Sequence, residues 1–130
     1  FGRKKVNYEA ALAYKSGLLK SAFERARERL PEDPAFLEFC GRSEHWLDDY
    51  SLYMVLKEKL FAATWRDFPK ELRDRKKSAL AEWREKTSGE TLYHKFVQHL
   101  FFSQWRALGD YCRSRGIKLI GDIPYYVNFD

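Results

Sequence analysis

The chain has 130 residues, of which 45% are hydrophobic and 33% charged, and its formal net charge is +5. This apolar content excludes a disordered chain, and the length suffices for one domain with a core. Basic residues alternate with Glu and Asp, as at 25–29 and 73–77, which favours solvated helix faces over a phosphate-binding stripe. We therefore predict no nucleic-acid partner. We also predict no membrane contact, because no apolar run approaches the roughly 18 residues of a membrane span.

The first 115 residues have the pattern of consecutive helices. Asn7 is the expected N-cap of the first helix, which is predicted to run to about Leu30 and to end before Pro31. Its apolar residues recur at helical spacing, at Leu12, Leu19, Phe23 and Leu30.

Two further helices are predicted between residues 33 and 61. Asp33 and Pro34 have the pattern of an N-cap and a first helical residue, for a short helix over residues 35–40 that Gly41 is expected to end. Ser43 is then the expected cap of a longer helix that runs to about residue 61. The broad apolar face of this longer helix consists of Trp46, Leu47, Tyr50, Tyr53, Met54 and Leu60.

Residues 64–91 are predicted to contain two breaks. The first is a turn over residues 64–69 that Trp65 and Phe68 hold in place, since Pro69 disfavours helical geometry in Phe68. Residues 70–86 then form a charged helix or helix pair whose one large apolar anchor is Trp83. Residues 87–91 are the second predicted loop.

The longest predicted helix runs from Thr91 to Arg115. Its apolar residues cover too wide a surface for a helix with one buried side. We therefore expect it to pack against both the other helices and the terminal segment. The residues of this surface are Leu92, Phe96, Val97, Leu100, Phe101, Trp105, Leu108 and Cys112.

The terminal segment, residues 116–130, is the only strong strand signal in the sequence. Apolar, mostly β-branched residues from Ile117 to Val127 are typical of a strand buried on both faces in a parallel sheet. Such a strand needs neighbours, and no other segment has comparable character, so we interpret the chain as part of a larger α/β protein. Without neighbours the segment is expected to be disordered, to fold back on the helices, or to self-associate with a second copy.

Polar and aromatic residues follow this predicted strand. In parallel α/β proteins the chemistry gathers at the carboxyl ends of strands, which here are followed by Asp122, Tyr125, Asn128 and Asp130. Aromatic rings with Asp and Asn side chains are typical of carbohydrate clefts, where rings cover sugar faces and polar groups bind hydroxyls. We therefore take these four as candidate substrate-binding residues. Composition alone leaves Asp122 and Asp130 open between a site residue and an acceptor for a local turn.

Two other sets of residues are candidates for catalytic or metal-binding groups. His94 and His99 are five positions apart, roughly 140° around a helix, so they do not share a metal ion and we predict no metal site. Asp48 and Asp49 point roughly 100° apart on a helix and do not form a catalytic pair. We expect structural contacts for them, one with a neighbouring Arg or backbone group and the other with water.

The sequence has no glycine-rich phosphate loop, no Gly-x-Ser-x-Gly motif and no Cys/His couple in a suitable context. Nucleotide binding and serine or cysteine hydrolysis therefore have no support in it. Cys40 and Cys112 lie far apart without metal-type spacing, which is typical of free thiols in a reducing cytosol, and we predict a cytoplasmic protein.

Three stretches together resemble a known family. They are Trp46–Leu52, Phe96–Trp105 and Gly116–Val127, the last containing Gly-Asp-Ile-Pro. In motif, order and spacing they are similar to 4-α-glucanotransferases, the amylomaltase or disproportionating-enzyme family, glycoside hydrolase family 77. The resemblance covers the chain from about Val6 but a minor part of the family's length.

This resemblance implies a TIM (β/α)8 barrel enzyme that transfers α-1,4-glucan segments between maltooligosaccharides by a retaining mechanism without an organic cofactor. It implies a mainly α-helical chain, with residues 1–115 as a helical subdomain inserted in the barrel and residues 116–130 as one barrel strand and the start of its active-site loop. Asp122 and Asp130 match family aspartates at the active-site end. The family's catalytic motifs, Arg-x-Asp-His, Ala-Glu-Asp-Leu-Gly and Thr-His-Asp, do not occur here, so no catalytic residue is assigned and the chain alone is expected to be inactive. A freestanding basic helical module that binds RNA or protein is the alternative.

Overall fold

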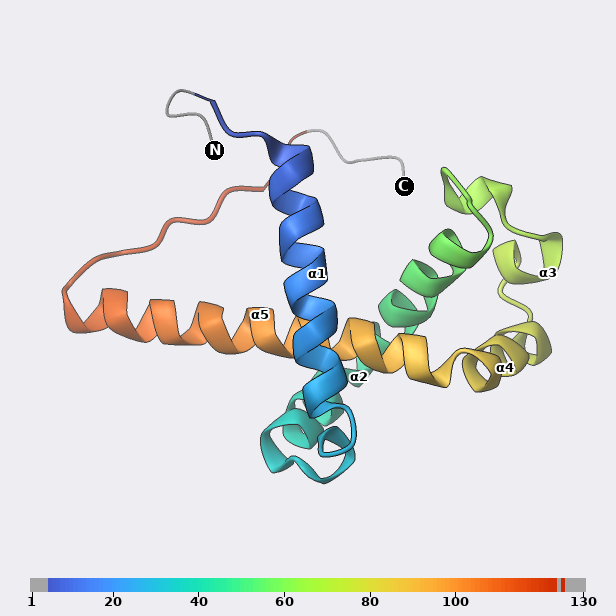
Figure 1. The fold of residues 1–130 in the computed structure, drawn as a ribbon, viewed down its shortest axis with the longest axis horizontal. Helices are drawn as coiled ribbons and strands as arrows, with labels where there is room; N and C mark the ends of the chain where they lie inside the picture. Colours follow the sequence, from blue (N-terminus) through green and yellow to red (C-terminus); the bar gives the residue numbers. More distant parts are fainter. Residues whose placement is uncertain (1–4, 124, 126–130) are drawn as a thin grey trace.

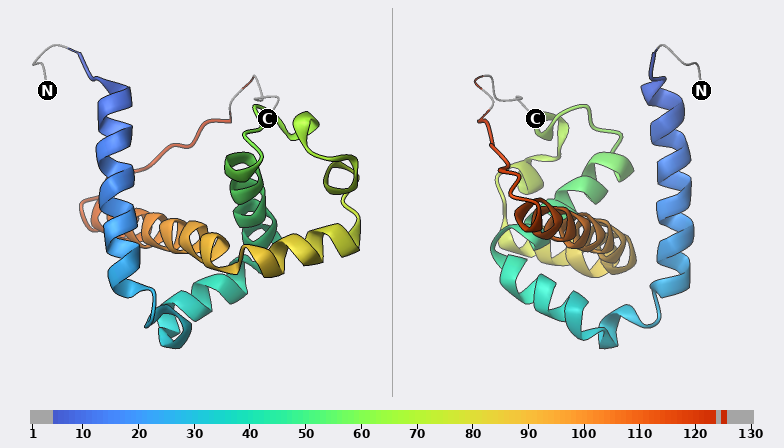
Figure 2. Two further views of the ribbon diagram at one scale, coloured as in Figure 1. Left: turned by 45° about the vertical axis from the view of Figure 1, so that its right-hand side comes forward. Right: turned by 90° about the vertical axis from the view of Figure 1, so that its left-hand side faces the viewer.

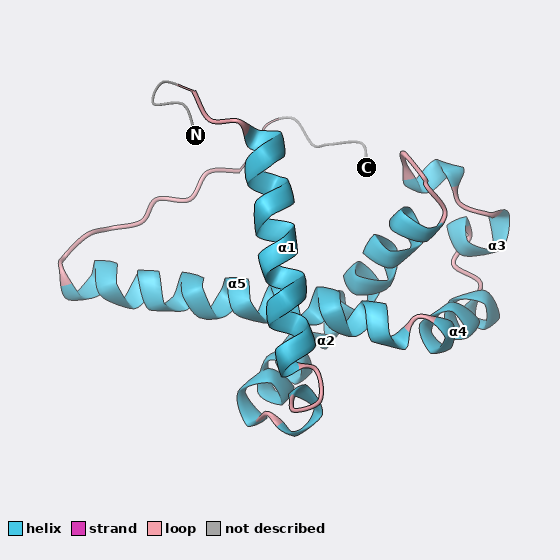
Figure 3. Ribbon diagram, viewed as in Figure 1, coloured by secondary structure: helices cyan, strands magenta, loops and turns pink. Residues whose placement is uncertain are grey.

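The computed structural model describes residues 5–123 and 125, and these residues form a mainly helical body (Figure 1). No strand occurs among them (Figure 3). The long helix α5 crosses α2, and α1 lies across the middle of α5 (Figure 1, Figure 2). In chain order the elements are α1 (Tyr8–Ala26), the 3-10 turn η1 (Leu30–Glu32), α2 (Pro34–Lys59), the 3-10 turn η2 (Trp65–Asp67), α3 (Lys70–Arg73), α4 (Lys77–Lys86) and α5 (Ser88–Ser114).

Helix α1 begins where the sequence predicts and ends earlier. The Asn7 side chain accepts a hydrogen bond of 3.0 Å from the Ala10 amide, which confirms the predicted N-cap. The helix stops at Ala26 because a proline ring clashes with the carbonyl four residues before it, and Pro31 therefore disfavours helix around Arg27. The prediction that it runs to Leu30 is wrong, and Leu30 instead lies buried in η1.

Helix α2 is one helix where the sequence predicts two. Asp33 caps it, accepting hydrogen bonds from the Ala35 and Phe36 amides, as predicted. Gly41, however, does not end the helix, and Ser43, the predicted cap of a second one, is buried in its interior. A glycine inside a helix costs only about 1 kcal/mol relative to alanine, which burial of a continuous apolar face outweighs.

The connection after α2 contains the predicted turn. Thr64 and Asp67 form a capping box, in which the Thr64 amide donates to the Asp67 carboxylate at 2.8 Å. Phe68 holds the turn as a buried residue, whereas Trp65 keeps 39% of its surface exposed. Residues 70–86 form a pair of helices, α3 and α4, which is one of the two arrangements that the sequence predicts.

Two predictions about the following residues are wrong. Trp83 is not the one large apolar anchor of the α3–α4 pair, because Leu72 is the buried residue there. Residues 87–91 are not a loop, because α5 begins at Ser88 directly after α4. Thr87 marks the boundary: it is buried, and its hydroxyl donates to the Trp83 carbonyl oxygen at 2.6 Å. This hydrogen bond satisfies the buried Thr87 hydroxyl at a tight junction between two helices. The sequence pattern alone predicts a loop there.

The described residues form two core clusters, and α2 takes part in both. The first joins α1, η1, α2 and α5 and consists of Phe23, Leu30, Phe36 and Phe96. The second joins the end of α2 to the α3–α4 lobe and consists of Leu52, Leu56, Phe68 and Leu72. Helix α2 is therefore the element that connects the α1–α5 contact with the α3–α4 lobe.

Asp48 and Asp49 make structural contacts on two sides of α2. Asp49 accepts hydrogen bonds from the Arg75 guanidinium and, at 2.8 Å, from that of Arg84. The hydrogen bond from Arg75 is the main reason that the pKa of Asp49 lies below its ordinary value. Asp48 pairs with Lys95 of α5 at 2.5 Å rather than facing water alone. The predicted Arg contact is thus confirmed for Asp49, and both carboxylates join elements instead of forming a catalytic pair.

The second half of α5 and the segment after it leave a large apolar surface exposed. Phe101 and Trp105 are 55% and 51% exposed, although their half of α5 was expected to be covered on two sides. Residues 117–123 run back from the end of α5 toward α1 (Figure 1) without forming the expected strand. Ile120 is 95% and Ile123 is 88% exposed, so this part has not folded back on the helices either. An isolated extended segment has no neighbour to accept its backbone hydrogen bonds. Residues 124 and 126–130 of the predicted strand region lie outside the described residues.

Replacing Phe61 with glycine is expected to stabilise the chain. Phe61 follows α2 at a φ of +49°, in the left-handed region that favours glycine, and its ring is 94% exposed. The Phe61→Gly change should raise the free energy of unfolding by about 0.5–1 kcal/mol, measured by urea denaturation. Phe61→Ala is the matched control, because it removes the ring but keeps a Cβ atom in the strained geometry. Equal effects of the two changes would contradict this explanation.

Replacing Gly41 with alanine tests the continuity of α2. Nothing lies within 4 Å of a Cβ atom built on Gly41, so alanine fits without a clash. Gly41→Ala should stabilise the chain by about 0.5–1 kcal/mol, because alanine is the better residue inside a helix. A loss of stability in thermal unfolding would instead indicate that the chain leaves helical geometry at this position.

Candidate functional site

The structure describes two of the four predicted substrate-binding residues. Asp122 is exposed in the extended segment after α5, and Tyr125 is 92% exposed. Asn128 and Asp130 lie outside the described residues. The predicted carbohydrate cleft at the end of the strand therefore stays a prediction.

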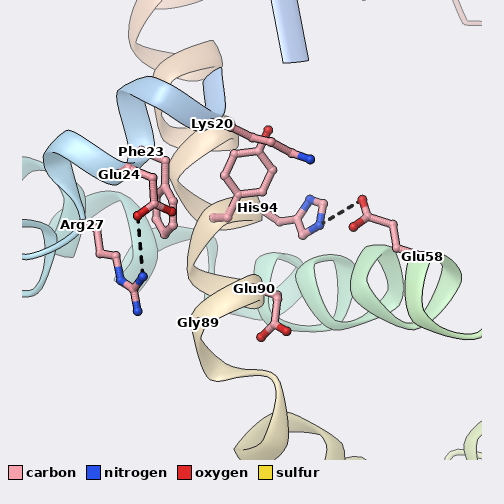
Figure 4. A pocket seen from close by; sticks show the side chains of 9 residues that line it. Lys20, Phe23, Glu24, Arg27, Glu58, Gly89, Glu90 and His94 are labelled. Atoms are coloured by element: carbon pink, nitrogen blue, oxygen red, sulfur yellow. Dashed lines mark ion pairs between the residues drawn. The ribbon is translucent and has the colours of Figure 1, made fainter. Parts of the chain in front are cut away.

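A cavity of about 380 Å³ lies between α1, α2 and α5 (Figure 4). Helical spacing places three side chains of α1 and that of its C-cap residue, Arg27, on one wall. Helix α5 contributes a second wall, and Glu58 comes from the last turns of α2. The lining residues are Lys20, Phe23, Glu24, Arg27, Glu58, Gly89, Glu90, Tyr93 and His94. Sequence analysis missed this cavity, since its walls are more than 30 positions apart in the chain.

The apolar part of the cavity wall consists of two rings. Phe23 is buried, and its ring meets that of Tyr93 edge to face, with centroids 5.4 Å apart and planes at 74°. Gly89 lies one helical turn before Tyr93, and nothing lies within 4 Å of a Cβ atom built on it. The absence of a side chain at Gly89 therefore leaves space at this edge of the cavity.

His94 is the most buried titratable group of the cavity. It is 8% exposed, and its Nε2 atom lies 3.6 Å from a carboxylate oxygen of Glu58, as the dashed line in Figure 4 marks. Burial lowers the pKa of His94, and the nearby Glu58 carboxylate partly opposes this. The imidazole is therefore neutral near neutral pH and has one nitrogen that donates and one that accepts.

The other polar groups provide both donors and acceptors. Glu24 pairs with Arg27 at 3.7 Å, and Glu90 pairs with Lys59 at 2.6 Å. The hydrogen bond from Lys59 lowers the pKa of Glu90, so this carboxylate stays ionised. Lys20 extends over the cavity from α1 (Figure 4). Among the described residues, no group of three His, Cys, Asp or Glu side chains has the geometry to hold a metal ion.

The stability of the chain is expected to fall as the pH drops below about 6.5, the ordinary pKa of histidine. Because the pKa of His94 is lower in the folded state, the unfolded chain binds the proton more readily. The contribution of neutral His94 is therefore present above the unfolded pKa and lost as the pH falls through the folded one. Unfolding free energies from about pH 7 to pH 5 should decline less steeply in His94→Gln. The exposed His45 provides the control, and a His45→Gln chain that lost the same slope would contradict the assignment to His94.

The comparisons with known proteins all indicate the same family. The family model described as 4-alpha-glucanotransferase, glycoside hydrolase family 77, matches residues 2–130. A 4-alpha-glucanotransferase of Synechocystis is 39% identical over 132 residues, covering 100% of this chain and 26% of that protein. Proteins of the same name from Thermus thermophilus and Clostridium butyricum are 39% and 36% identical, each over 100% of this chain and over 26% and 27% of their own lengths.

No helix of the described residues is long and apolar enough to cross a membrane.

The chain spans about a quarter of the length of the curated relatives that it matches. The family model covers all but the first residue, and each of these relatives is similar along the whole chain. The chain belongs to the 4-alpha-glucanotransferase family, glycoside hydrolase family 77.

Proposed function

We propose that the chain acts as the helical part of a 4-alpha-glucanotransferase, which transfers α-1,4-glucan segments between maltooligosaccharides by a retaining mechanism. The family match over residues 2–130 is the observation that carries this proposal. The relatives' names agree on one reaction, from bacteria to the plastid enzymes of potato and Arabidopsis. A freestanding RNA- or protein-binding module is not favoured, because the match is to an enzyme family along the whole chain.

The exposed apolar half of α5 supports a place beside a barrel. Gly116, at a φ of +69°, ends the helix, and the Ile117 amide donates to the Cys112 carbonyl oxygen at 2.9 Å, which turns the chain back along α5. A helix, a glycine turn and an apolar extended segment form the αβ half of a βαβ unit. In the complete enzyme, residues 116–130 would form a TIM-barrel strand with the start of its loop, and residues 1–115 would form the helical subdomain. Trp105 and its neighbours on α5 would then pack on the sheet.

The residues at the carboxyl end of this strand and in its loop are the proposed glucan contacts. Active-site groups of barrels lie at the carboxyl ends of strands, where Asp122, Tyr125, Asn128 and Asp130 follow. Asp130 binds or orients the glucan near the bond that is cleaved, and Asp122 chiefly holds the strand end. Retaining transfer needs two carboxylates on either side of the glycosidic bond. The family's motifs for them do not occur in this sequence, so other parts of the enzyme provide them.

The cytoplasm is the proposed location. Both cysteines are free thiols, Cys40 half-buried and Cys112 buried, which fits a reducing compartment.

The test is a maltotriose disproportionation assay on the complete gene product and on the 130-residue chain, with glucose release as the readout. We expect activity in the former and none in the latter. In the complete product, Asp130→Asn should lower the transfer rate or weaken maltose binding by about tenfold or more, because one charged hydrogen bond to a hydroxyl is lost. Asp67→Asn, in an exposed capping box far along the sequence, is the control. Unchanged kinetics of Asp130→Asn would refute its role, and a complete product without transfer activity would refute the proposed function.

A further inference from the structure

We propose that the cavity between α1, α2 and α5 binds one or two glucose units of an α-glucan. The choice of sugar rests on the proposed function, whereas the class of ligand, a neutral polyhydroxyl compound, follows from the cavity itself.

The size and walls of the cavity fit a sugar. Its volume of about 380 Å³ lies at the lower end of the range of ligand sites, roughly 300–1,000 Å³. Tyr93 offers an aromatic surface, held in place by the buried ring of Phe23. Aromatic rings cover the apolar face of a pyranose ring, while its hydroxyls need both donors and acceptors around the edge.

The charges around the cavity disfavour an ionic ligand. Three carboxylates, those of Glu24, Glu58 and Glu90, would repel an anion, and Lys20 and Arg27 would repel a cation. The cavity therefore attracts neither anions nor cations uniformly, because side chains of both signs surround it. A neutral polyhydroxyl ligand, in contrast, accepts hydrogen bonds from the ammonium and guanidinium groups and donates to the carboxylates.

Glu58 and Gly89 have separate roles in this site. The Glu58 side chain is 65% exposed and lies 3.6 Å from the neutral His94, so its carboxylate oxygens are accessible to ligand hydroxyls. Gly89 leaves the edge of the cavity open, because no side chain projects there. A larger residue at position 89 should therefore close the site without changing its charge.

The experiment is isothermal titration calorimetry of the chain with maltose and maltotriose, using substitutions at two glycines of α5. Gly89→Leu should weaken binding by about tenfold or more, because the added side chain occupies the cavity edge. Gly109→Leu is the matched control: Gly109 lies in the same helix, and its Cβ position is equally free of neighbours within 4 Å. We expect maltose affinity within about twofold of wild type for this control. Both changes should keep or raise the melting temperature, since leucine is the better helix former.

Glu58→Gln provides a second variant that keeps the shape of the side chain. It should also weaken maltose binding, by severalfold, because a charged acceptor becomes a neutral amide. The proposal is overturned if the wild-type chain shows no saturable binding of maltose or maltotriose, or if Gly89→Leu binds as tightly as Gly109→Leu. Competition by citrate, an anion, would also overturn the assignment to a neutral ligand.

This result is separable from that of the disproportionation assay. A complete gene product that transfers glucose, together with a chain that binds no maltose, would refute the sugar site alone. A chain that binds maltose through this cavity, in a gene product without transfer activity, would leave the sugar site in place and refute the proposed function.

Discussion

The crossing of α2 and α5 is the contact on which the other elements depend. Aromatic rings interdigitate along it: Phe39 meets both His99 and Phe102, with centroids 5.5 and 5.6 Å apart, and Phe102 also meets Trp46. Such pairs add directional stabilisation to the burial of area. Helix α1 packs on the same crossing through Phe23, and the α3–α4 lobe attaches to the far end of α2. Loss of the crossing would break up the first core cluster, which joins α1, η1, α2 and α5.

Ion pairs join α2 and α5 around this crossing. Asp48 reaches Lys95 across it, and Lys59 at the end of α2 reaches Glu90 near the start of α5. Exposed pairs of this kind contribute little stability each, about 0–1 kcal/mol. The same arrangement of the helices places Glu58 next to His94 and forms the cavity between α1, α2 and α5.

Part of the chain buries its apolar side chains, and another part leaves them exposed. Around Phe36 and Phe96 the helices bury their apolar faces against one another. Beyond Phe101 the apolar stripe of α5 faces water, and the extended segment that follows α5 also exposes its apolar residues. Large exposed apolar surfaces are typical of interaction sites, and the chain spans about a quarter of the length of its relatives.

The sequence by itself determined the helical class, the caps at Asn7 and Asp33 and the family, because these depend on local spacing and on short motifs. Tertiary structure decided the rest. Gly41 remains inside α2, and residues 87–91 become a helix start, because packing between distant segments outweighs a local cost of about 1 kcal/mol. The cavity at His94 was equally unreadable from sequence, since it exists only where three helices meet. Residues 117–123 have the sequence pattern of a strand but do not form one, because a strand needs neighbouring strands to accept its hydrogen bonds.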